Sequence, residues 1–377
     1  MRFVFASDSF KGTLSSARIG ALLETAAREA FPDAECITLP IADGGEGTLD
    51  AISSVQLGRR VALHAHDGLM RPRIAEILLS DGAAFVEAAS TCGLTLLEND
   101  ERNPLATSSY GVGECIRFAL DQGCDNITVG LGGSCTNDGG MGCLRALGIR
   151  FLDAEERELL GCGSDLERVA RIDESELHCR VHDVAFTVMN DVDNPLLGPT
   201  GATYVFGPQK GADGRALKRL EAGMRHFSEA IEASHPGTDF ATPGFGAAGG
   251  LGMALSVFLG AQMRSGIEEL LRWLDFDAIA AGADLIVTGE GKLDGQSLQG
   301  KAISGIVAHA NRIGVPVATL CGSVALDERQ LRDAGITCAI DISEGQPLDY
   351  ALAHAEQNYR QAARKLFSAI KSGSTPW

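Results

Sequence analysis

The sequence predicts an α/β protein in which one strand–helix domain is interrupted by a second, mixed α/β domain. The chain has 377 residues, which is more than a single hydrophobic core usually supports. At both ends, apolar strand-like runs alternate with helix-like runs at the spacing of parallel βαβ units. This alternation stops near residue 58 and resumes near residue 265. We therefore expect residues 1–58 plus 266–377 to form one domain and residues 59–265 to form the inserted one.

The alternation begins at the start of the chain. Residues 2–7 and 35–41 are apolar runs typical of buried strands. Between them, residues 16–30 repeat apolar side chains at helical spacing on one face, which predicts an amphipathic helix. A further helix, containing Leu49 and Ile52, is expected after the second strand.

The C-terminal third repeats the same rhythm. Strands are expected over residues 285–288, 315–321 and 338–342, with helices between them. A long helix is expected to close the chain over about residues 349–370. Because strands joined through a helix run parallel with right-handed crossovers, this rhythm predicts a parallel sheet.

The middle of the chain has a different character. Residues 61–65, 74–79 and 83–88 are typical of short strands joined by turns, which predicts a meander rather than βαβ units. Residues 127–131 and 184–189 are further apolar strands, and each runs into a polar or glycine-rich loop. The inserted domain is therefore expected to be mixed.

The composition argues against several classes of function. The net charge of −18 disfavours nucleic acid or an anionic membrane surface as the main partner, since both require a basic face. The ten cysteines form no Cys-x-x-Cys pair, so neither a zinc ribbon nor a disulfide framework is expected. The first residues do not resemble a secretory signal, and the longest apolar stretch, residues 251–263, is too short to span a membrane. We expect a cytoplasmic protein.

The segment from Gly130 to Gly142 is dense in glycine and hydroxyl residues and follows a predicted strand. Such a loop before a helix is a natural anion cradle, because the first N–H groups of a helix lack partners within it. The loop does not match the dinucleotide fingerprint, since the third glycine would fall at Cys135. A tight strand–helix turn without a ligand is the alternative.

The segment from Gly289 to Ala302 is a second candidate for phosphate binding. Residues 295–302 nearly match the P-loop pattern, but Ala302 stands where the magnesium-binding hydroxyl belongs. No strand directly precedes the pattern either, so we exclude a true P-loop. Its glycines and lysines could still bind phosphate in another geometry, and a solvated loop is the alternative.

Asp191 and Asp193 follow the strand at residues 184–189. Two carboxylates at a strand end suit Mg²⁺ coordination or a catalytic base. An EF-hand is excluded, because Pro195 and Leu196 occupy positions that need a ligand and a glycine. The pattern leaves open an aspartyl-phosphate phosphohydrolase with Asp191 as nucleophile, and also a structural turn.

Two polar clusters follow the first two strands. Asp8 and Lys11 close the first strand, where open α/β sheets usually contact ligands. Asp43 and Glu46 have capping-box spacing before a predicted helix, so both a functional and a capping role are open. The eight histidines show no metal-ligand spacing.

These loops belong to a series of seven motifs. The motifs are SDSFKG (7–12), IADGGEGT (41–48), GGSCTNDGG (132–140), DVDNPL (191–196), FGPQKG (206–211), GAAGGLG (246–252) and TGEGK (288–292). In this order they resemble the bacterial type 1 glycerate kinase family, and the shared order is far more specific than any one motif. The chain departs from the usual family pattern at Cys135, Asn190, Lys292 and in the looser segment 67–72, without losing a carboxylate or a loop glycine.

The resemblance implies transfer of a phosphoryl group from ATP to D-glycerate, giving 2-phospho-D-glycerate, with Mg²⁺ as the metal. It also implies a flavodoxin-like parallel-sheet domain and an inserted domain of restriction-enzyme-like topology, with the active site in the cleft between them. The expected partner is the small-molecule substrate, with a homodimer left open and neither nucleic acid nor a membrane involved. The alternatives are an aspartate-nucleophile phosphohydrolase acting on a small phosphorylated acid, and a nucleotide-binding protein without turnover.

The resemblance also implies roles for single residues. Asp191 is the expected base for the glycerate hydroxyl, with Lys11 and Asp43 as further catalytic residues. Asp193 and Glu290 are the expected metal ligands, and Asp43 is a further candidate. The residues expected to bind the nucleotide are Gly132, Gly133, Ser134, Thr136, Asn137, Lys292 and Lys301. The residues expected to bind the substrate are Asp8, Ser9 and Arg71, of which Arg71 meets its carboxylate together with Lys11.

Overall fold

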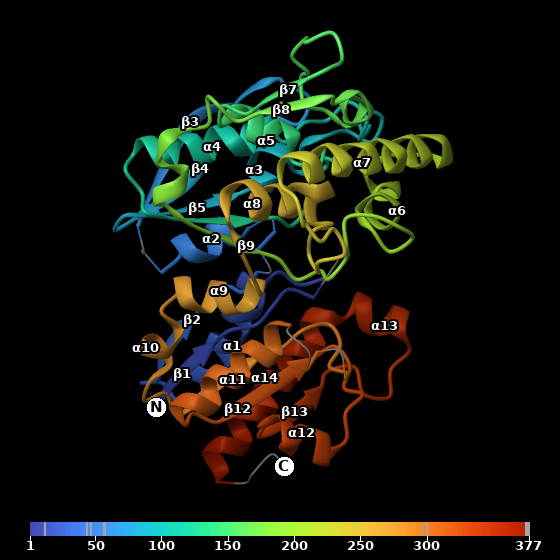
Figure 1. The fold of residues 1–377 in the computed structure, drawn as a ribbon. Helices are drawn as coiled ribbons and strands as arrows, with labels where there is room; N and C mark the ends of the chain where they lie inside the picture. Colours follow the sequence, from blue (N-terminus) through green and yellow to red (C-terminus); the bar gives the residue numbers. More distant parts are fainter. Residues whose placement is uncertain are drawn as a thin grey trace. The chain divides into compact units, whose positions relative to one another are not determined.

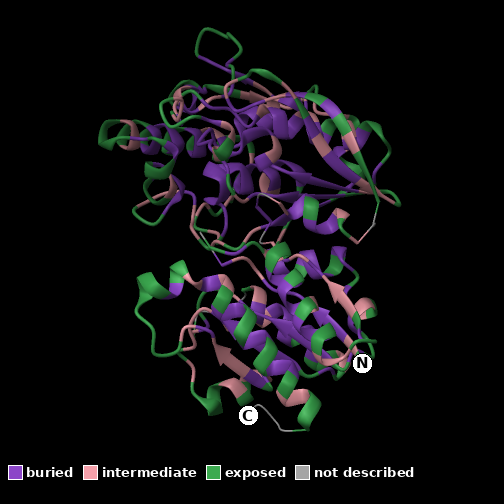
Figure 2. Ribbon diagram, turned by 180° about the vertical axis from the view of Figure 1, so that it is seen from behind, coloured by how far each residue is buried: buried purple, intermediate pink, exposed green. Residues whose placement is uncertain are grey.

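The computed structural model describes residues 1–10, 13–42, 44–45, 47–55, 58–295, 297–298 and 301–373. The chain divides into two compact units. Unit 1 contains Met1–Ala42, Asp50–Leu57 and Ile267–Trp377, and unit 2 contains Asp43–Leu49 and Gly58–Gly266. Each unit has its own cluster of buried apolar side chains. Buried residues are purple in Figure 2. Within the described residues, no helix has both the length and the apolar character needed to cross a membrane.

Unit 1 is built on a five-stranded parallel sheet. Its strands are β1 (Arg2–Phe5), β2 (Glu35–Thr38), β11 (Leu285–Thr288), β12 (Val317–Cys321) and β13 (Cys338–Asp341). They lie in the order β13-β12-β11-β1-β2, and all neighbours are parallel (Figure 1). Numbered along unit 1 alone and taken from the β2 edge, this order is 2-1-3-4-5, which is the flavodoxin-like order. The expected flavodoxin-like sheet is confirmed.

Helices separate the strands of unit 1. They are α1 (Ser16–Ala30), α9 (Gly266–Trp273), α10 (Phe276–Ala280), α11 (Ala302–Ile313), α12 (Glu328–Ala334), α13 (Leu348–Ala353) and α14 (Ala355–Ser372). α1 has the predicted bounds, and the hydroxyl of its N-cap Ser15 accepts a hydrogen bond from the first turn. The closing helix was predicted as one, but it is divided at His354 into α13 and α14. Phe367 of α14 packs against Phe3 and Phe5 of β1, with ring centroids 5.1 and 6.1 Å apart, which holds α14 on the sheet.

Unit 2 is built on a six-stranded mixed sheet. Its strands are β3 (Arg59–His66), β4 (Pro72–Ser80), β5 (Ala83–Glu87), β6 (Asn126–Gly130), β9 (Ala185–Met189) and β10 (Gln262–Arg264), in the order β10-β9-β6-β5-β4-β3. The first three strands form the predicted antiparallel meander, and the others continue the sheet in parallel. A separate antiparallel pair joins β7 (Arg150–Leu152) and β8 (Arg171–Asp173).

The helices of unit 2 are labelled in Figure 1. They are α3 (Ala89–Cys92), α4 (Tyr110–Asp121), α5 (Met141–Ala146), α6 (Ala202–Phe206), α7 (Gly214–Ser234) and α8 (Leu251–Leu259). Of these, α3, α4 and α8 pack against strands of this sheet. The 3-10 helices are η1 (Leu94–Leu96), η2 (Gly163–Arg168), η3 (Cys179–Asp183), η4 (Pro208–Lys210) and η5 (Ala247–Gly250). α7 was not expected from the sequence, although Asp213 caps it by accepting hydrogen bonds from two main-chain nitrogens of its first turn.

The short segment 43–49 belongs to unit 2 because its backbone is bonded there. Gly132 donates a hydrogen bond to the carbonyl oxygen of Gly44 over 3.2 Å. The buried carboxylate of Glu87 accepts from Gly47 N over 3.2 Å and from Leu49 N over 2.9 Å. Glu87 therefore stabilises the start of α2 (Thr48–Ser53), a helix that passes from unit 2 into unit 1.

Candidate active site

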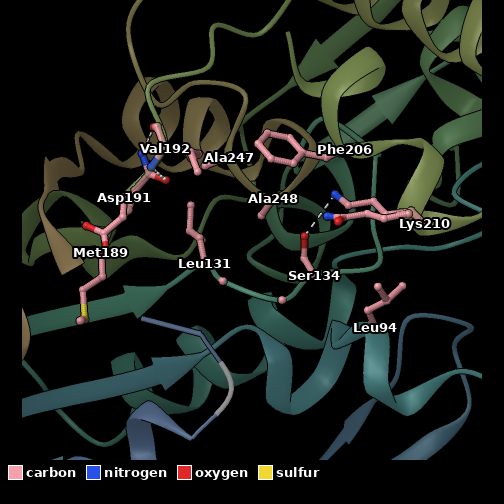
Figure 3. Close-up of a pocket in the computed structure, with 14 residues that line it drawn as sticks. Leu94, Leu131, Ser134, Met189, Asp191, Val192, Phe206, Lys210, Ala247 and Ala248 are labelled. Atoms are coloured by element: carbon pink, nitrogen blue, oxygen red, sulfur yellow. Dashed lines mark hydrogen bonds between the residues drawn. The ribbon is translucent and has the colours of Figure 1, made fainter. Parts of the chain in front are cut away.

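Two loops meet where β6 and β9 end. The strands are parallel neighbours, in register at Gly130 and Met189, so the chain leaves both at the same edge of the sheet. The loop after β6 is the predicted phosphate loop, and the loop after β9 carries Asp191. Both line a cavity of about 170 Å³ (Figure 3). The lining residues are Leu94, Leu131, Gly132, Gly133, Ser134, Met189, Asn190, Asp191, Val192, Phe206, Gln209, Lys210, Ala247 and Ala248.

Glycines allow the segments around this pocket to approach each other. A Cβ on Gly132 would lie 2.5 Å from the Cα of Gly45, so no larger residue fits between the two segments. Gly249 has a φ of +67°, and a Cβ there would lie 2.2 Å from the carbonyl oxygen of Thr136. These glycines are therefore required by packing, apart from any contact with a ligand.

The side chain of Asp138 stabilises the predicted phosphate loop. Its fully buried carboxylate accepts hydrogen bonds from the main chain and hydroxyl of Ser109, both over 2.7 Å. It also accepts from the nitrogens of Gly140 and Gly142, over 3.1 and 3.2 Å. Burial raises the pKa of Asp138, and these four hydrogen bonds oppose the rise. The carboxylate thereby joins the loop to the start of α5.

Lys210 is a pocket residue for which the sequence analysis assigned no role. It closes η4, and its side chain is buried. Its Nζ donates to the carbonyl oxygen of Thr136 over 2.7 Å. It also donates to Oγ of Ser134 over 3.3 Å, which Figure 3 marks with a dashed line. Burial lowers its pKa to about 8. Lys210 lies in the motif at residues 206–211, which the sequence singled out. The motif does not show, however, that this lysine is buried in a pocket.

Asp191 is held at the opposite side of the pocket. Its Oδ1 accepts a hydrogen bond from Gly266 N over 2.7 Å. The preceding Asn190 stabilises the turn, because its amide donates to the carbonyl oxygen of Val192 over 2.6 Å and accepts from Val192 N over 3.2 Å. Asp193 is exposed and does not line the pocket.

Only part of the predicted phosphate loop faces the pocket. Gly132, Gly133 and Ser134 line it, whereas Thr136 and Asn137 are fully buried behind it. The Thr136 hydroxyl donates to a carbonyl of η5 over 3.5 Å, and the Asn137 amide donates to the hydroxyl of a threonine in α6 over 3.3 Å. These two side chains hold the loop against its neighbours.

Arg71 is engaged away from the pocket lining. Its guanidinium contacts Asp67 and Glu101, each over 2.6 Å, and both hydrogen bonds raise the pKa of Arg71. Asp67 also accepts from the main-chain nitrogens of Leu69 and Arg71 over 2.9 Å. The described contacts of Arg71 stabilise the turn between β3 and β4.

In unit 1, the loops after β1 and β11 bring Asp8 and Glu290 together. Asp8 N donates to the carbonyl oxygen of Gly289 over 3.0 Å, and Ser9 N donates to Oδ1 of Asp8 over 2.6 Å. Burial raises the pKa of Glu290, and the negative charge of Asp8 adds to the rise, whereas a hydrogen bond from Ser297 and the charge of Lys301 oppose it. The Oε1 atom of Glu290 is buried and has no hydrogen-bond partner among the described residues.

The other predicted residues are dispersed. Lys292 is exposed and forms an ion pair of 3.0 Å with Asp294, while the exposed Lys301 stands at the N-cap of α11. Lys11 and Asp43 lie outside the described residues, as does Glu46 of the capping-box pair. Within the described ranges, no three histidine, cysteine, aspartate or glutamate side chains are grouped closely enough to hold a metal ion.

The chain is similar over its whole length to proteins of one family. The model of the glycerate kinase family matches residues 3–371. The chain is 40% identical to a glycerate kinase of Bacillus subtilis (strain 168), over 100% of this chain and 99% of that protein. It is 37% identical to a glycerate 2-kinase of Escherichia coli (strain K12), over 99% of each. A crystal structure from Salmonella typhimurium LT2, provisionally named glycerate kinase 2, matches with a TM-score of 0.83 and 38% identity over 99% of both chains. This chain therefore belongs to the glycerate kinase family and is a kinase, as its seven motifs predicted.

Proposed function

We propose that this protein transfers the terminal phosphoryl group of ATP to the 2-hydroxyl of D-glycerate, giving 2-phospho-D-glycerate. The observation that carries the proposal is the pocket of unit 2, which is lined both by Asp191 and by the glycine-rich loop at Gly132–Ser134. Phosphoryl transfer requires a carboxylate to orient the attacking hydroxyl and N–H groups to receive phosphoryl oxygens. Membership of the glycerate kinase family supports the same reaction.

The pocket volume suits the small reactant. A cavity of about 170 Å³ is well below the roughly 300–1,000 Å³ of pockets that enclose larger ligands. It has room for a three-carbon acid or one phosphoryl group, so the rest of the nucleotide must bind elsewhere. In the proposed complex, Asp191 accepts the proton of the acceptor hydroxyl, and its hydrogen bond from Gly266 N holds Oδ1 in place.

Carboxylates at the strand ends of unit 1 fit a hard cation. The partnerless Oε1 of Glu290 and the nearby charge of Asp8 form an acidic pair that Mg²⁺, which prefers oxygen ligands, would neutralise. Bound Mg²⁺ supplies charge neutralisation on the ATP phosphates. Lys292 and Lys301 offer further positive charge to these phosphates, and Asp193 remains a predicted ligand.

The test is a coupled assay with ATP, Mg²⁺ and D-glycerate. Glycerate-dependent ADP release is expected, and its absence would refute the proposal. Proton-coupled ³¹P spectra of the product distinguish the two esters, because a phosphate on C2 couples to one carbon-bound proton and gives a doublet, whereas one on C3 gives a triplet. Release of inorganic phosphate from a phosphorylated acid without a nucleotide would instead favour a phosphohydrolase.

Several expectations from the sequence stay predictions. They are the catalytic roles of Lys11 and Asp43, the substrate contacts of Asp8, Ser9 and Arg71, and the nucleotide contacts of Thr136 and Asn137. The use of both domains by the active site, the cytoplasmic localisation and the oligomeric state also stay predictions. A complex with an ATP analogue and glycerate would test the residue roles together.

A further inference from the structure

Lys210 carries a buried charge that no carboxylate of the described residues contacts. Its side chain is only 2% exposed, and its two hydrogen bonds go to neutral acceptors, the Thr136 carbonyl and the Ser134 hydroxyl. No carboxylate of the described residues forms an ion pair with it. A buried ammonium without a counter-ion is costly, and such groups are usually paired.

None of the titratable groups near Lys210 contacts its ammonium group. These groups are the thiols of Cys135 and Cys92 and the carboxylate of Asp138. Burial raises the pKa of Cys135 to about 12 and that of Cys92 well above its ordinary value, so both thiols are neutral near pH 7. The Asp138 carboxylate acts on Lys210 through its charge alone, because its oxygens accept their four hydrogen bonds from Ser109, Gly140 and Gly142. An anionic ligand in the pocket would complete the pairing of Lys210.

We propose that Lys210, together with Ser134, binds the carboxylate of the acceptor acid, while Asp191 receives the proton of its hydroxyl. Figure 3 shows Ser134 and Lys210 on one side of the pocket and Asp191 on the other. Because the Ser134 oxygen accepts a hydrogen bond from Lys210, its own hydroxyl hydrogen is available to an anionic oxygen. This inference rests on the proposed function and identifies the group that selects a carboxylate-bearing acceptor.

One further observation favours the carboxylate of the acid over a nucleotide phosphate. The cavity alone does not distinguish them, because it has room for a three-carbon acid or for one phosphoryl group. Arg71, the arginine that the sequence suggested for the carboxylate, already pairs with Asp67 and Glu101. A phosphoryl oxygen would offer the same anionic chemistry to Lys210, so the experiment must separate the two ligands.

The arrangement predicts a particular pH dependence. The free-enzyme pKa of Lys210 lies near 8, so the ammonium is present at pH 7 and is lost as the pH rises above 8. Binding of the carboxylate favours the protonated form. The KM for glycerate should therefore rise up to about tenfold for each pH unit above 8, whereas the KM for ATP should not follow it.

The decisive experiment compares both KM values in wild type and in Lys210→Met. At pH 7 the variant should raise the KM for glycerate about 30-fold or more, as expected when one partner of a buried charge pair is removed, with the KM for ATP changed less than about twofold. Lys210→Arg should recover part of the affinity, and its KM should lose the rise above pH 8, because arginine stays protonated. Ser134→Ala should also raise the KM for glycerate, but by a smaller factor than Lys210→Met.

Lys218→Met is the matched control, because Lys218 is an exposed lysine of α7 and does not line the pocket. Thermal unfolding identifies any variant that fails to fold. A rise in the KM for ATP alone would assign Lys210 to a phosphate, and unchanged KM values would leave it only a structural role; either result would overturn the inference.

Calorimetric titration of glycerate without nucleotide separates this inference from the proposed kinase reaction. Wild type that binds glycerate but transfers no phosphoryl group would refute the kinase reaction alone, whereas equal binding by Lys210→Met would refute this inference alone.

Discussion

The main-chain nitrogen of Gly266 donates a hydrogen bond of 2.7 Å to Oδ1 of Asp191. Gly266 follows β10, which pairs in parallel with β9, and Asn190 N donates to the carbonyl oxygen of Arg264 over 3.0 Å. The position of the candidate base is therefore set by a strand that lies more than seventy residues later in the chain. Because the position of Asp191 depends on this distant strand, the motif around Asp191 does not predict where its carboxylate lies.

Asp191→Asn tests the role of this carboxylate. The amide oxygen can still accept the hydrogen bond from Gly266 N, but the side chain cannot take a proton. We expect kcat to fall by a factor of about 10²–10⁴ with little change in thermal stability. Steady-state kinetics on the variant and on Asp183→Asn, a matched change at an exposed residue of η3, would check this. Full activity in Asp191→Asn would show that Asp191 is not the catalytic base.

Gly132→Ala tests the close contact between the phosphate loop and segment 44–45. The added Cβ would lie 2.5 Å from the Cα of Gly45, so one backbone must shift. We expect at least a tenfold loss of kcat/KM, because a displacement of about 1 Å at a catalytic loop has effects of this size or larger. Gly214→Ala is the control, since a Cβ there meets nothing within 4 Å and Gly214 begins α7. Equal behaviour of the two variants would show that the close contact is not needed.

The stability of the ligand-free protein should also report the charge on Lys210. Its pKa is lowered from 10.5 to about 8 on folding, so between these values the unfolded chain binds more protons than the folded one. The free energy of unfolding of wild type, measured relative to Lys210→Met, should therefore increase from pH 8 to about pH 10.5, by roughly 3 kcal/mol in total.

Taking this difference cancels the titration of the buried thiols, which both proteins share. Denaturant unfolding at intervals of half a pH unit would measure it. A difference that stays flat over the whole range would mean that Lys210 is not a desolvated ammonium in the folded protein.

Glu290→Gln tests the cation site proposed in unit 1. Chelation should abolish activity, and added Mg²⁺ should restore it. If Glu290 binds or orients the ion, the variant should need about 10–100-fold more Mg²⁺ for half-maximal rate, because the amide is a weaker ligand without charge. Glu344→Gln, at an exposed residue, should titrate as wild type. An unchanged Mg²⁺ titration in Glu290→Gln would exclude this residue as a ligand.

Sequence patterns predicted the regular elements well where one face or one run is clearly apolar. The helix at 16–30 and the strand at 285–288 have the predicted bounds, because their apolar residues are packed in the core of unit 1. The helix α7 was not predicted, and the closing helix was predicted without its break at His354. The signal for α7 was present, because Leu220, Met224, Phe227 and Ile231 repeat at helical spacing behind the N-cap Asp213. The break at His354 depends on tertiary packing instead.

The candidate site divides in the same way. The sequence by itself identified the kinase family and both loops of the pocket. Each motif and its glycines are contiguous in the chain, so they can be recognised without the tertiary structure. Only the tertiary structure decided which side chains face the pocket. It buries Thr136 and Asn137 behind the loop, engages Arg71 with two carboxylates, and brings Lys210 from a segment more than seventy residues away to Ser134. Burial and pairing depend on contacts between distant segments, and no short stretch of sequence contains them.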